Sequence, residues 1–324
     1  MSDVEIGLLV GDRYRVTRLL GAGGMGVVYE AVDKMDPRWR VAIKFLSPQL
    51  SKSREWCQRF EREVKAGSAL NTDYIARIFA SGAMPVRGGR RRPWIVFEYL
   101  DGEPLAARIE REGPIAFRDV AWMLEHLLQG LEVAHGAGLV HRDIKPANLF
   151  LEACGRLRIL DFGIAKYLRG GPSTMAALTS IEKILGSQQY MSPEQFANAT
   201  DVDGRADLYS AGLVAYQLLT GVLPLERRVA KAITEVKTLA RVPPLARFTG
   251  VEWPAELDAW VQRMTAPRRD DRFRTASEAL VQWRAACELV KGREPMIEKA
   301  RNPGAAGPSG ADTVTAVRSS IPRR

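Results

Sequence analysis

The chain lacks any long run of uncharged hydrophobic residues among its 324 positions. A helix that crosses a bilayer needs about 20 such residues, so we expect no membrane span within this chain. Residues 1–10 carry acidic and no basic side chains, which is unlike the start of a secretory signal peptide. Because hydrophobic residues still make up 46% of the sequence, a fibrous or disordered chain is excluded and one large or two ordinary folded units are expected.

Cysteine is also scarce, since only Cys57, Cys154 and Cys287 are present and they lie far apart. There is no CxxC pair and no Cys/His spacing typical of zinc, so neither a structural zinc site nor a disulfide framework is predicted. A reducing compartment is the simplest setting for such a chain, and we expect it to be cytoplasmic.

Positive charge is in excess, because 47 lysines and arginines oppose 38 acids and give a net charge of +9. This excess favours anionic partners such as nucleotides, nucleic acids, lipid headgroups or acidic proteins. The short basic runs at 90–92, 227–228 and 268–269 are dispersed and lack interleaved aromatic residues. We therefore interpret them as solvated surface and expect no nucleic acid partner.

The first hundred residues are predicted to form a small sheet with one helix on it. Short β-branched or apolar segments separated by glycine and proline are typical of strands, and they lie at 14–20, 27–32, 41–46 and 93–100. Between residues 54 and 70 apolar side chains recur every four positions, which indicates one face of a helix.

After residue 100 the hydrophobic period becomes helical. Gly221 is a plausible C-cap of one helix and Thr275 opens another with a capping-box pattern. The periodicity stops at about residue 291, after which glycine, proline, serine, alanine and arginine dominate. Residues 291–324 are therefore predicted to form a disordered basic tail. This tail would be either a docking arm or inert. The predicted helices centre on residues 120–131, 213–219, 257–264 and 275–283.

A glycine-rich segment, Gly21-Ala-Gly23-Gly-Met-Gly26, fits the pattern G-x-G-x-x-G. The same pattern in a dinucleotide-binding fold opens a helix after a strand, whereas here the following residues predict a strand. A glycine turn between two strands can lay its backbone N–H groups over phosphates, because no Cβ blocks their approach. The alternative is a hairpin without chemical importance.

Lys44 ends the apolar segment 41–44, where an ammonium group is costly unless it meets an anion. Phosphates beneath the glycine turn would supply one. The helix that follows carries Glu61 and Glu63, and Glu63 is the better candidate to hold Lys44 because it adjoins Val64 on the apolar face. The alternative for Glu63 is a solvated carboxylate.

The densest polar cluster, His141-Arg-Asp-Ile-Lys-Pro-Ala-Asn148, lies between two apolar segments. Asp143 can accept a hydroxyl proton, Lys145 can neutralise a moving phosphate, and Asn148 can bind Mg²⁺. Asp161 follows another short strand and is a plausible second oxygen ligand. A polar loop with an Asx turn is the alternative.

Taken together, these motifs resemble the signature of protein kinases in order, spacing and context. Over residues 14–290 the chain resembles a bacterial eukaryotic-like (Hanks-type) serine/threonine protein kinase. The resemblance implies an α+β, bilobal protein-kinase fold with a small antiparallel β-sheet lobe carrying one helix and a larger, mainly helical lobe. The implied division is an N-terminal extension at 1–13, lobes at 14–100 and 101–290, and the tail at 291–324.

The resemblance also implies ATP and Mg²⁺ (or Mn²⁺) as cofactors and an adenine site between the lobes. Residues 96–100 would form the hinge between the lobes, where the backbone C=O of Glu98 and the N–H of Leu100 would pair with the adenine edge and Phe97 would close the back of the pocket. Lys44 would align the phosphates. Val28, Ala42 and Leu149 would sandwich the adenine ring. The remaining nucleotide-binding residues would be Leu20, Gly21, Gly23 and Gly26.

Several structural residues follow from the same resemblance. Ser192-Pro-Glu194 stands where the family has A-P-E, and Glu194 would pair with Arg272 in a buried ion pair. Asp207 would hold the backbone of the His141–Asp143 loop, and His141 would be structural. His126 and His135 are expected to be packing or surface residues.

Substrate and regulation are implied by further positions. Lys145 favours protein serine and threonine hydroxyls, and Ser187 keeps the hydroxyl common in such members. Arg142 before Asp143 would need a counter-anion, which phosphorylation of Thr179 and Ser180 would supply. Trans-autophosphorylation there implies a transient kinase homodimer.

Three functions therefore remain open: an active protein kinase, a pseudokinase scaffold that binds nucleotide without turnover, and a small-molecule phosphotransferase of the same superfamily. Lys44, Asp143, Asn148 and Asp161 are all present, which favours activity. The sequence shows no sensor domain, so the chain is expected to be either a soluble kinase activated by a partner or a fragment of a longer receptor kinase.

Overall fold

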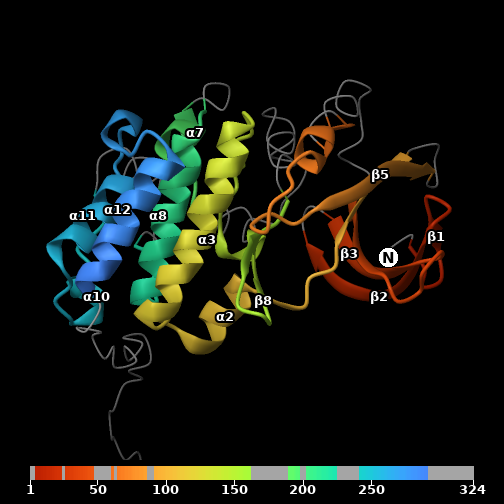
Figure 1. The fold of residues 1–324 in the computed structure, drawn as a ribbon, viewed down its shortest axis with the longest axis horizontal. Coiled ribbons are helices and arrows are strands. Elements are labelled where there is room, and N and C mark those ends of the chain that lie inside the picture. The colour runs from red at the N-terminus through yellow and green to blue at the C-terminus, as the bar shows by residue number, and fades with distance from the viewer. Residues whose placement is uncertain are drawn as a thin grey trace, which may run out of the picture.

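A computed structural model describes residues 4–23, 26–46, 60–61, 64–85, 91–161, 189–197, 202–224 and 241–290. These residues form a strand-rich lobe and a larger helical lobe, which lie at opposite ends of the long axis in Figure 1. The predicted α+β, two-lobed architecture is confirmed.

The strand-rich lobe is a six-stranded antiparallel sheet in the order β1-β2-β3-β4-β6-β5. All four strands expected from the sequence are present. β5, which forms the edge beside β6, was not among the predicted strands. The bounds are β1 Leu9–Val10, β2 Tyr14–Gly23, β3 Gly26–Asp33, β4 Arg40–Leu46, β5 Ile78–Pro85 and β6 Arg91–Glu98.

The two faces of this sheet pack into different apolar clusters, as the two-residue period of a strand requires. Ile43 and Phe45 of β4 join one cluster with Tyr29 of β3. Leu46 joins the other with Phe97, and Ala42 packs against it. Because Lys44 lies between Ala42 and Leu46 in the same alternation, its side chain shares the face of the second cluster.

The segment before Tyr14, expected to be an extension, is packed onto the sheet. Val4 and Val10 are 4% and 3% exposed. The amide of Gly7 donates to the carbonyl of Val16 at 2.8 Å, and the hydroxyl of Tyr29 donates to the carbonyl of Val4 at 3.4 Å. Residues 4–13 therefore contribute to the core of this lobe.

A second, three-stranded antiparallel sheet lies between the two lobes. It consists of β7 Gly102–Pro104, β8 Leu149–Glu152 and β9 Leu157–Ile159. The amide of Ile159 donates to the carbonyl of Tyr74 at 2.8 Å, and the amide of Ala76 donates to the carbonyl of Ile159 at 2.9 Å. These two bonds join β9 to the chain that leads into β5.

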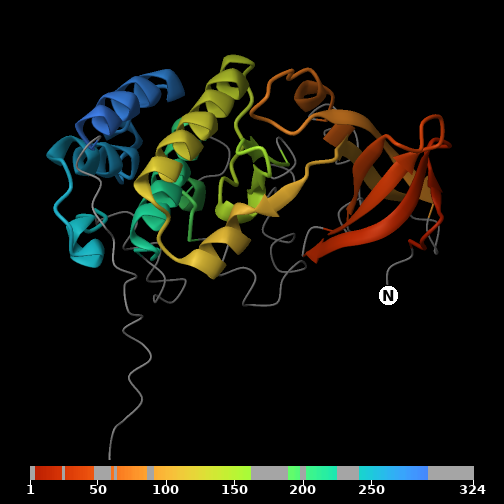
Figure 2. The same ribbon diagram turned by 60° about the horizontal axis from the view of Figure 1, so that its bottom comes forward.

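The helical lobe is organised around α8 Arg205–Thr220, of which all residues except Arg205 and Gln217 are buried. α8 contacts α3, α10 and α11, and Figures 1 and 2 both show α3 between the α8–α11–α12 group and the three-stranded sheet. The predicted cap Gly221 adopts φ 74° after α8. The other helices are α2 Leu105–Glu112, α3 Phe117–Gly136, α7 Pro193–Ala197, α10 Ala246–Thr249, α11 Ala255–Met264 and α12 Ala276–Val290.

The helices predicted over residues 120–131, 213–219, 257–264 and 275–283 correspond to α3, α8, α11 and α12. At the start of α12 the hydroxyl of Thr275 accepts the amide of Glu278 at 3.1 Å, as the capping-box pattern predicted. Within the described part of the chain, every helix is too short or too polar to cross a bilayer.

Candidate active site

The structure brings Asp143, Lys145 and Asn148 together in the loop between α3 and β8. Asp143 is 5% exposed. Its carboxylate Oδ2 lies 2.8 Å from the Lys145 Nζ and accepts the Asn148 amide Nδ2 at 3.0 Å. The same amide group donates to the backbone carbonyl of Asp143 at 2.8 Å. The carboxylate is thus held by one cation and one neutral donor.

His141 is fully buried beneath this loop, and both of its ring nitrogens are used. Nδ1 accepts the backbone amide of Asp143 at 3.2 Å, and Nε2 lies 2.8 Å from the carbonyl of Leu160. Because a carbonyl can only accept, this pattern assigns the proton to Nε2. His141 therefore holds the backbone of both acidic segments, in agreement with the structural role expected for it.

Asp207, at the start of α8, fixes the same loop from below. Its carboxylate accepts the amides of His141 and Arg142 at 2.8 and 2.7 Å, as predicted, and it also bonds Nε2 of His135 at 2.9 Å. Burial would raise the pKa of Asp207, but the hydrogen bond and electrostatic attraction of His135 and the Arg142 amide lower it below its usual range. His135, expected only to pack or face solvent, is a partner in this network.

Lys44 of β4 contacts the carboxylate of Asp161 directly. The Lys44 side chain is 9% exposed and that of Asp161 is 22% exposed. The amide of Leu160 donates to the carbonyl of Asn148 at 2.9 Å, which places Asp161 beside the loop that carries Asp143. The structure thus joins the predicted strand lysine, metal aspartate and catalytic loop; Glu63 lies outside the described residues.

The side chains of Asn148 and Asp161 carry an amide oxygen and a carboxylate, which are the kinds of donor that Mg²⁺ takes. Both Nδ2 bonds of Asn148 go to Asp143, so its amide oxygen is turned away from that carboxylate. Among the described residues, no group of three or more histidine, cysteine, aspartate or glutamate side chains could hold a metal. Two oxygen ligands are compatible with Mg²⁺, which usually keeps several waters and substrate oxygens.

The glycine-rich segment is a hairpin turn, because β2 ends at Gly23, β3 begins at Gly26, and these two residues pair. This excludes the strand-to-helix turn of a dinucleotide-binding fold. Gly26 has φ 150°, and a Cβ there would lie 2.0 Å from the carbonyl oxygen of Phe45. A Cβ on Gly21 would meet nothing within 4 Å, so the turn faces open space at that position.

The predicted adenine-binding residues lie mainly on one side of the upper sheet. Ala42 pairs with Phe97, and Ala42 and Leu100 pack against the cluster that contains Phe97. Val28 pairs with Lys44, which places it on the same face. Leu20, 39% exposed, lies at an irregularity in the β2–β3 register.

Leu149 is placed differently from the expectation that it lines the adenine. It is fully buried in the core of the helical lobe, together with Leu151. Because side chains alternate along β8, Phe150 faces the opposite side of the strand and is half-buried. The Leu149 side chain therefore packs into the core of the helical lobe, and Phe150 is the residue that β8 presents on its other face.

The predicted hinge residue Glu98 is anchored through its side chain, which the sequence did not indicate. Its carboxylate contacts the guanidinium of Arg158 and accepts the amide of Arg77 at 2.8 Å. The Arg158 side chain is 4% exposed and also donates to the carbonyl of Ile75 at 3.0 Å. A charged residue in the middle of the apolar segment 157–160 was the only available signal.

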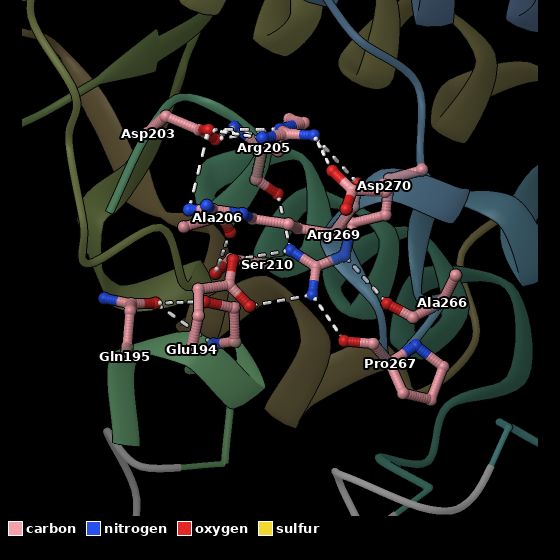
Figure 3. A network of polar contacts seen from close by, with 12 residues as sticks. Glu194, Gln195, Asp203, Arg205, Ala206, Ser210, Ala266, Pro267, Arg269 and Asp270 are labelled. Carbon is pink, nitrogen blue, oxygen red and sulfur yellow. Dashed lines mark hydrogen bonds and ion pairs between the residues drawn. The ribbon is translucent and has the colours of Figure 1, made fainter. Parts of the chain in front are cut away.

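The predicted ion pair of Glu194 with Arg272 is present within the polar network that Figure 3 shows around Glu194, and the Arg272 side chain is fully buried. Two guanidinium nitrogens lie 2.7 and 2.8 Å from the two carboxylate oxygens. The remaining N–H groups of Arg272 donate to the carbonyls of Arg205, Ala266 and Pro267. Burial would raise the pKa of Glu194, but the hydrogen bonds and charge of Arg272 lower it below its usual value.

Arg142 donates from Nη2 to the carbonyl of Val202 at 3.1 Å. This bond places its guanidinium next to the segment that leads into α8. The positions expected to be phosphorylated, Thr179 and Ser180, lie outside the described residues, as does Ser187.

Comparison with known proteins agrees with this geometry. Residues 14–282 match the protein kinase domain model. The chain is 37% identical over 240 residues to the serine/threonine-protein kinase PknA of Mycobacterium tuberculosis, covering 74% of this chain and 54% of that protein. It is also 37% identical over 276 residues to the probable serine/threonine-protein kinase PknB of Bifidobacterium longum, covering 83% of this chain and 39% of that protein.

Among solved structures, the kinase domain of Mycobacterium tuberculosis PknI superposes with a TM-score of 0.67 and 27% identity. The match covers 87% of this chain and 99% of that domain. The chain spans about half the length, or less, of the curated relatives it matches. Its sequence, fold and site together show that the chain belongs to the protein kinase domain family, among the bacterial Hanks-type serine/threonine kinases.

Proposed function

We propose that this chain transfers the γ-phosphate of ATP to serine and threonine hydroxyls of protein substrates. The observation that carries the proposal is the convergence of two acidic segments. Asp143 is held by Lys145 and Asn148, and Asp161 lies beside it because Leu160 bonds the carbonyl of Asn148. A buried base next to a metal-binding carboxylate is the arrangement that phosphoryl transfer requires.

Asp143 orients the attacking hydroxyl and takes its proton through the carboxylate. Lys145, bonded to Oδ2, places a positive charge where the transferred phosphate accumulates negative charge. Asn148 keeps the carboxylate in position through its two bonds to Asp143. These contacts restrict Asp143 before any substrate arrives, which lowers the cost of orientation during the reaction.

Lys44 binds the α- and β-phosphates, and Glu63 holds it there when the nucleotide is bound. Asp161 and Asn148 hold Mg²⁺ (or Mn²⁺), which neutralises charge on the phosphate oxygens. The glycine turn at Gly21, Gly23 and Gly26 covers the phosphates with its backbone amides.

The adenine lies between the upper sheet and β8. Its edge pairs with the backbone of Glu98 and Leu100, Phe97 closes the back of the pocket, and Leu20, Val28 and Ala42 cover the ring from above. Since Leu149 belongs to the core of the helical lobe, we assign the lower contact to Phe150. Apolar burial of the ring supplies much of the affinity.

Regulation by phosphate on Thr179 and Ser180 is part of the proposal, with Arg142 as the receiving cation. Two copies would meet transiently to exchange phosphate. Mass spectrometry of protein produced in a heterologous host should find phosphate in this segment, and its absence from active enzyme would contradict this mode of activation. Cys154 and Cys287 form no disulfide, and we place the catalytic domain in the cytoplasm, where ATP is available.

The test is transfer of labelled phosphate from ATP to the protein itself and to a generic basic protein. Asp143→Asn and Lys44→Met should each lower transfer by at least about a hundredfold without changing the melting temperature substantially. Asp270→Asn and Lys34→Met, exposed matched controls, should keep full activity. Wild-type transfer in both active-site variants would overturn the proposal.

The same assay separates the alternatives. ATP binding by the folded wild-type protein without any transfer would indicate a pseudokinase. Transfer confined to small-molecule acceptors would indicate a small-molecule phosphotransferase.

A further inference from the structure

Arg142, the residue directly before Asp143, has a left-handed backbone with φ 66°. A residue with a Cβ is strained in that conformation, because the Cβ crowds the neighbouring carbonyl oxygen. Such a residue persists only where its surroundings fix it. The contacts that fix Arg142 therefore also determine how Asp143 is presented.

The amide of Arg142 is held by Asp207 of α8 at 2.7 Å. Its carbonyl accepts the side-chain amide Nε2 of Gln195, from α7, at 2.9 Å. The next amide, that of Asp143, donates to Nδ1 of His141 at 3.2 Å. The peptide unit between Arg142 and Asp143 is thus held at its oxygen by Gln195 and at its N–H by His141.

Gln195 is itself oriented by Ser192. The Gln195 Oε1 atom accepts both the backbone amide of Ser192 at 3.0 Å and its hydroxyl at 3.1 Å. Two donors on the oxygen direct the amide nitrogen toward Arg142. Ser192 is fully buried, so its hydroxyl has a structural use at the position where the family motif has alanine.

We propose that Gln195 is a positioning residue for phosphoryl transfer, which holds the Arg142 carbonyl and thereby fixes the peptide unit that carries Asp143. It does not touch the substrate. Ser192 supports this role, because its two hydrogen bonds to Oε1 keep the amide nitrogen of Gln195 directed toward Arg142. The inference rests on the proposed function, because it assumes that Asp143 is the group that receives the hydroxyl proton.

Gln195→Glu tests the donor with almost no change in shape. The ionised carboxylate can still accept from Ser192 but cannot donate to the Arg142 carbonyl. We expect kcat to fall about tenfold, the effect of one lost hydrogen bond, with the KM for ATP unchanged. A protonated carboxyl regains a donor, so the ratio of variant to wild-type kcat should rise as the pH is lowered from about 8 to about 5.

Gln262→Glu is the matched control. Gln262 also donates its side-chain amide to a backbone carbonyl, that of Val242, at 2.9 Å, but it lies in α11. The Gln262→Glu variant should lose about as much stability as Gln195→Glu, while its kcat and the pH dependence of kcat stay those of the wild type. Ser192→Ala should shift kcat in the same direction as Gln195→Glu, but less, because the backbone amide of Ser192 remains.

Several outcomes would overturn the inference: an unchanged kcat in Gln195→Glu, a fall shared with Gln262→Glu, or a fall without recovery at low pH. If Gln195→Glu does not fold, Gln195→Met removes both amide atoms at similar length, and it should show the fall in kcat without the pH recovery. A Met variant with wild-type kcat would then overturn it. The Asp143→Asn variant separates the two proposals. If this variant stays active, the proposed function fails. If it is inactive while Gln195→Glu has wild-type kcat, only the positioning role of Gln195 fails.

Discussion

The imidazole of His135 fills the space beside Gly204, where a Cβ atom would lie 2.7 Å from Nδ1. Gly204 has φ −58° and ψ −20°, so its backbone would accept any residue. The glycine is needed for space alone. It allows His135 to reach Asp207, which holds the catalytic loop.

We expect Gly204→Ala to destabilise the protein by about 1–3 kcal/mol, because the displaced imidazole leaves the buried Asp207 with one donor fewer. The measurement is urea unfolding at neutral pH. Gly136→Ala, at the end of α3 where a Cβ meets nothing within 4 Å, is the control and should be neutral or stabilising. If the two variants were equally stable, the contact between His135 and Asp207 would make no measurable contribution to the stability of the fold.

Acid should weaken the fold through Glu194 and Asp207. Both have pKa values lowered in the folded protein, so the unfolded chain binds protons more tightly. Their contribution to the free energy of unfolding is complete above the ordinary carboxyl pKa of about 4 and is lost as the pH falls through the lowered values. Denaturant midpoints measured between about pH 6 and pH 2 should therefore decrease.

In Glu194→Gln this decrease should be shallower, because one of the two carboxyls is gone. At neutral pH the variant should lose about 3–5 kcal/mol, since the charge of Arg272 stays buried without its partner. The side chain of Arg272 is 0% exposed, which leaves water no access to it. Parallel pH curves for variant and wild type would show that Glu194 does not titrate in this range.

Leu149 and Phe150 should respond oppositely to truncation. Leu149→Ala should cost roughly 2–5 kcal/mol in urea unfolding while the KM for ATP changes little. Phe150→Ala should raise the KM for ATP severalfold at a smaller cost in stability, because the side chain is half-buried. A larger rise in KM for Leu149→Ala would restore Leu149 to the nucleotide site.

Replacing Arg158 should loosen the hinge at Glu98. Arg158→Met leaves the carboxylate of Glu98 without its cation, so we expect a loss of about 3 kcal/mol and a raised KM for ATP. Arg156→Met is the control: this half-exposed arginine lies 3.4 Å from Glu152 and 3.5 Å from Asp73, and its loss should change stability by less than about 1 kcal/mol. Matching losses in both variants would argue against the anchoring of Glu98.

Most of the regular structure could be predicted from hydrophobic period, but β5 could not. After Ile78 and Phe79 its residues are Ala-Ser-Gly-Ala-Met-Pro, which include no further β-branched side chain. A Cβ on Gly82 would lie 2.4 Å from the indole of Trp94 on β6. Packing between these two strands therefore requires a glycine, although glycine is atypical of strands. α2 was also missed, because only Leu105 and Ile109 of its eight residues are buried.

The residues of the site also differ in how far they could be predicted from the sequence. Asp143, Lys145 and Asn148 lie within one short motif and could be predicted, because their contacts are local. The partners Arg158 and Gln195 are 60 and 53 positions away from the residues they hold, and only folding brings them there. Leu149 and Phe150 could not be distinguished from the sequence, since both are apolar and only the alternation along β8 turns Leu149 into the core.

The packing of residues 4–13 has a practical consequence for recombinant fragments. A fragment trimmed to residues 14–282, the extent of the family match, would strip β1 from the sheet and uncover the apolar patch beneath Val4 and Val10. It would also cut α12 before Val290, which is fully buried. Such a truncation favours aggregation, whereas a fragment of residues 4–290 keeps both β1 and the whole of α12.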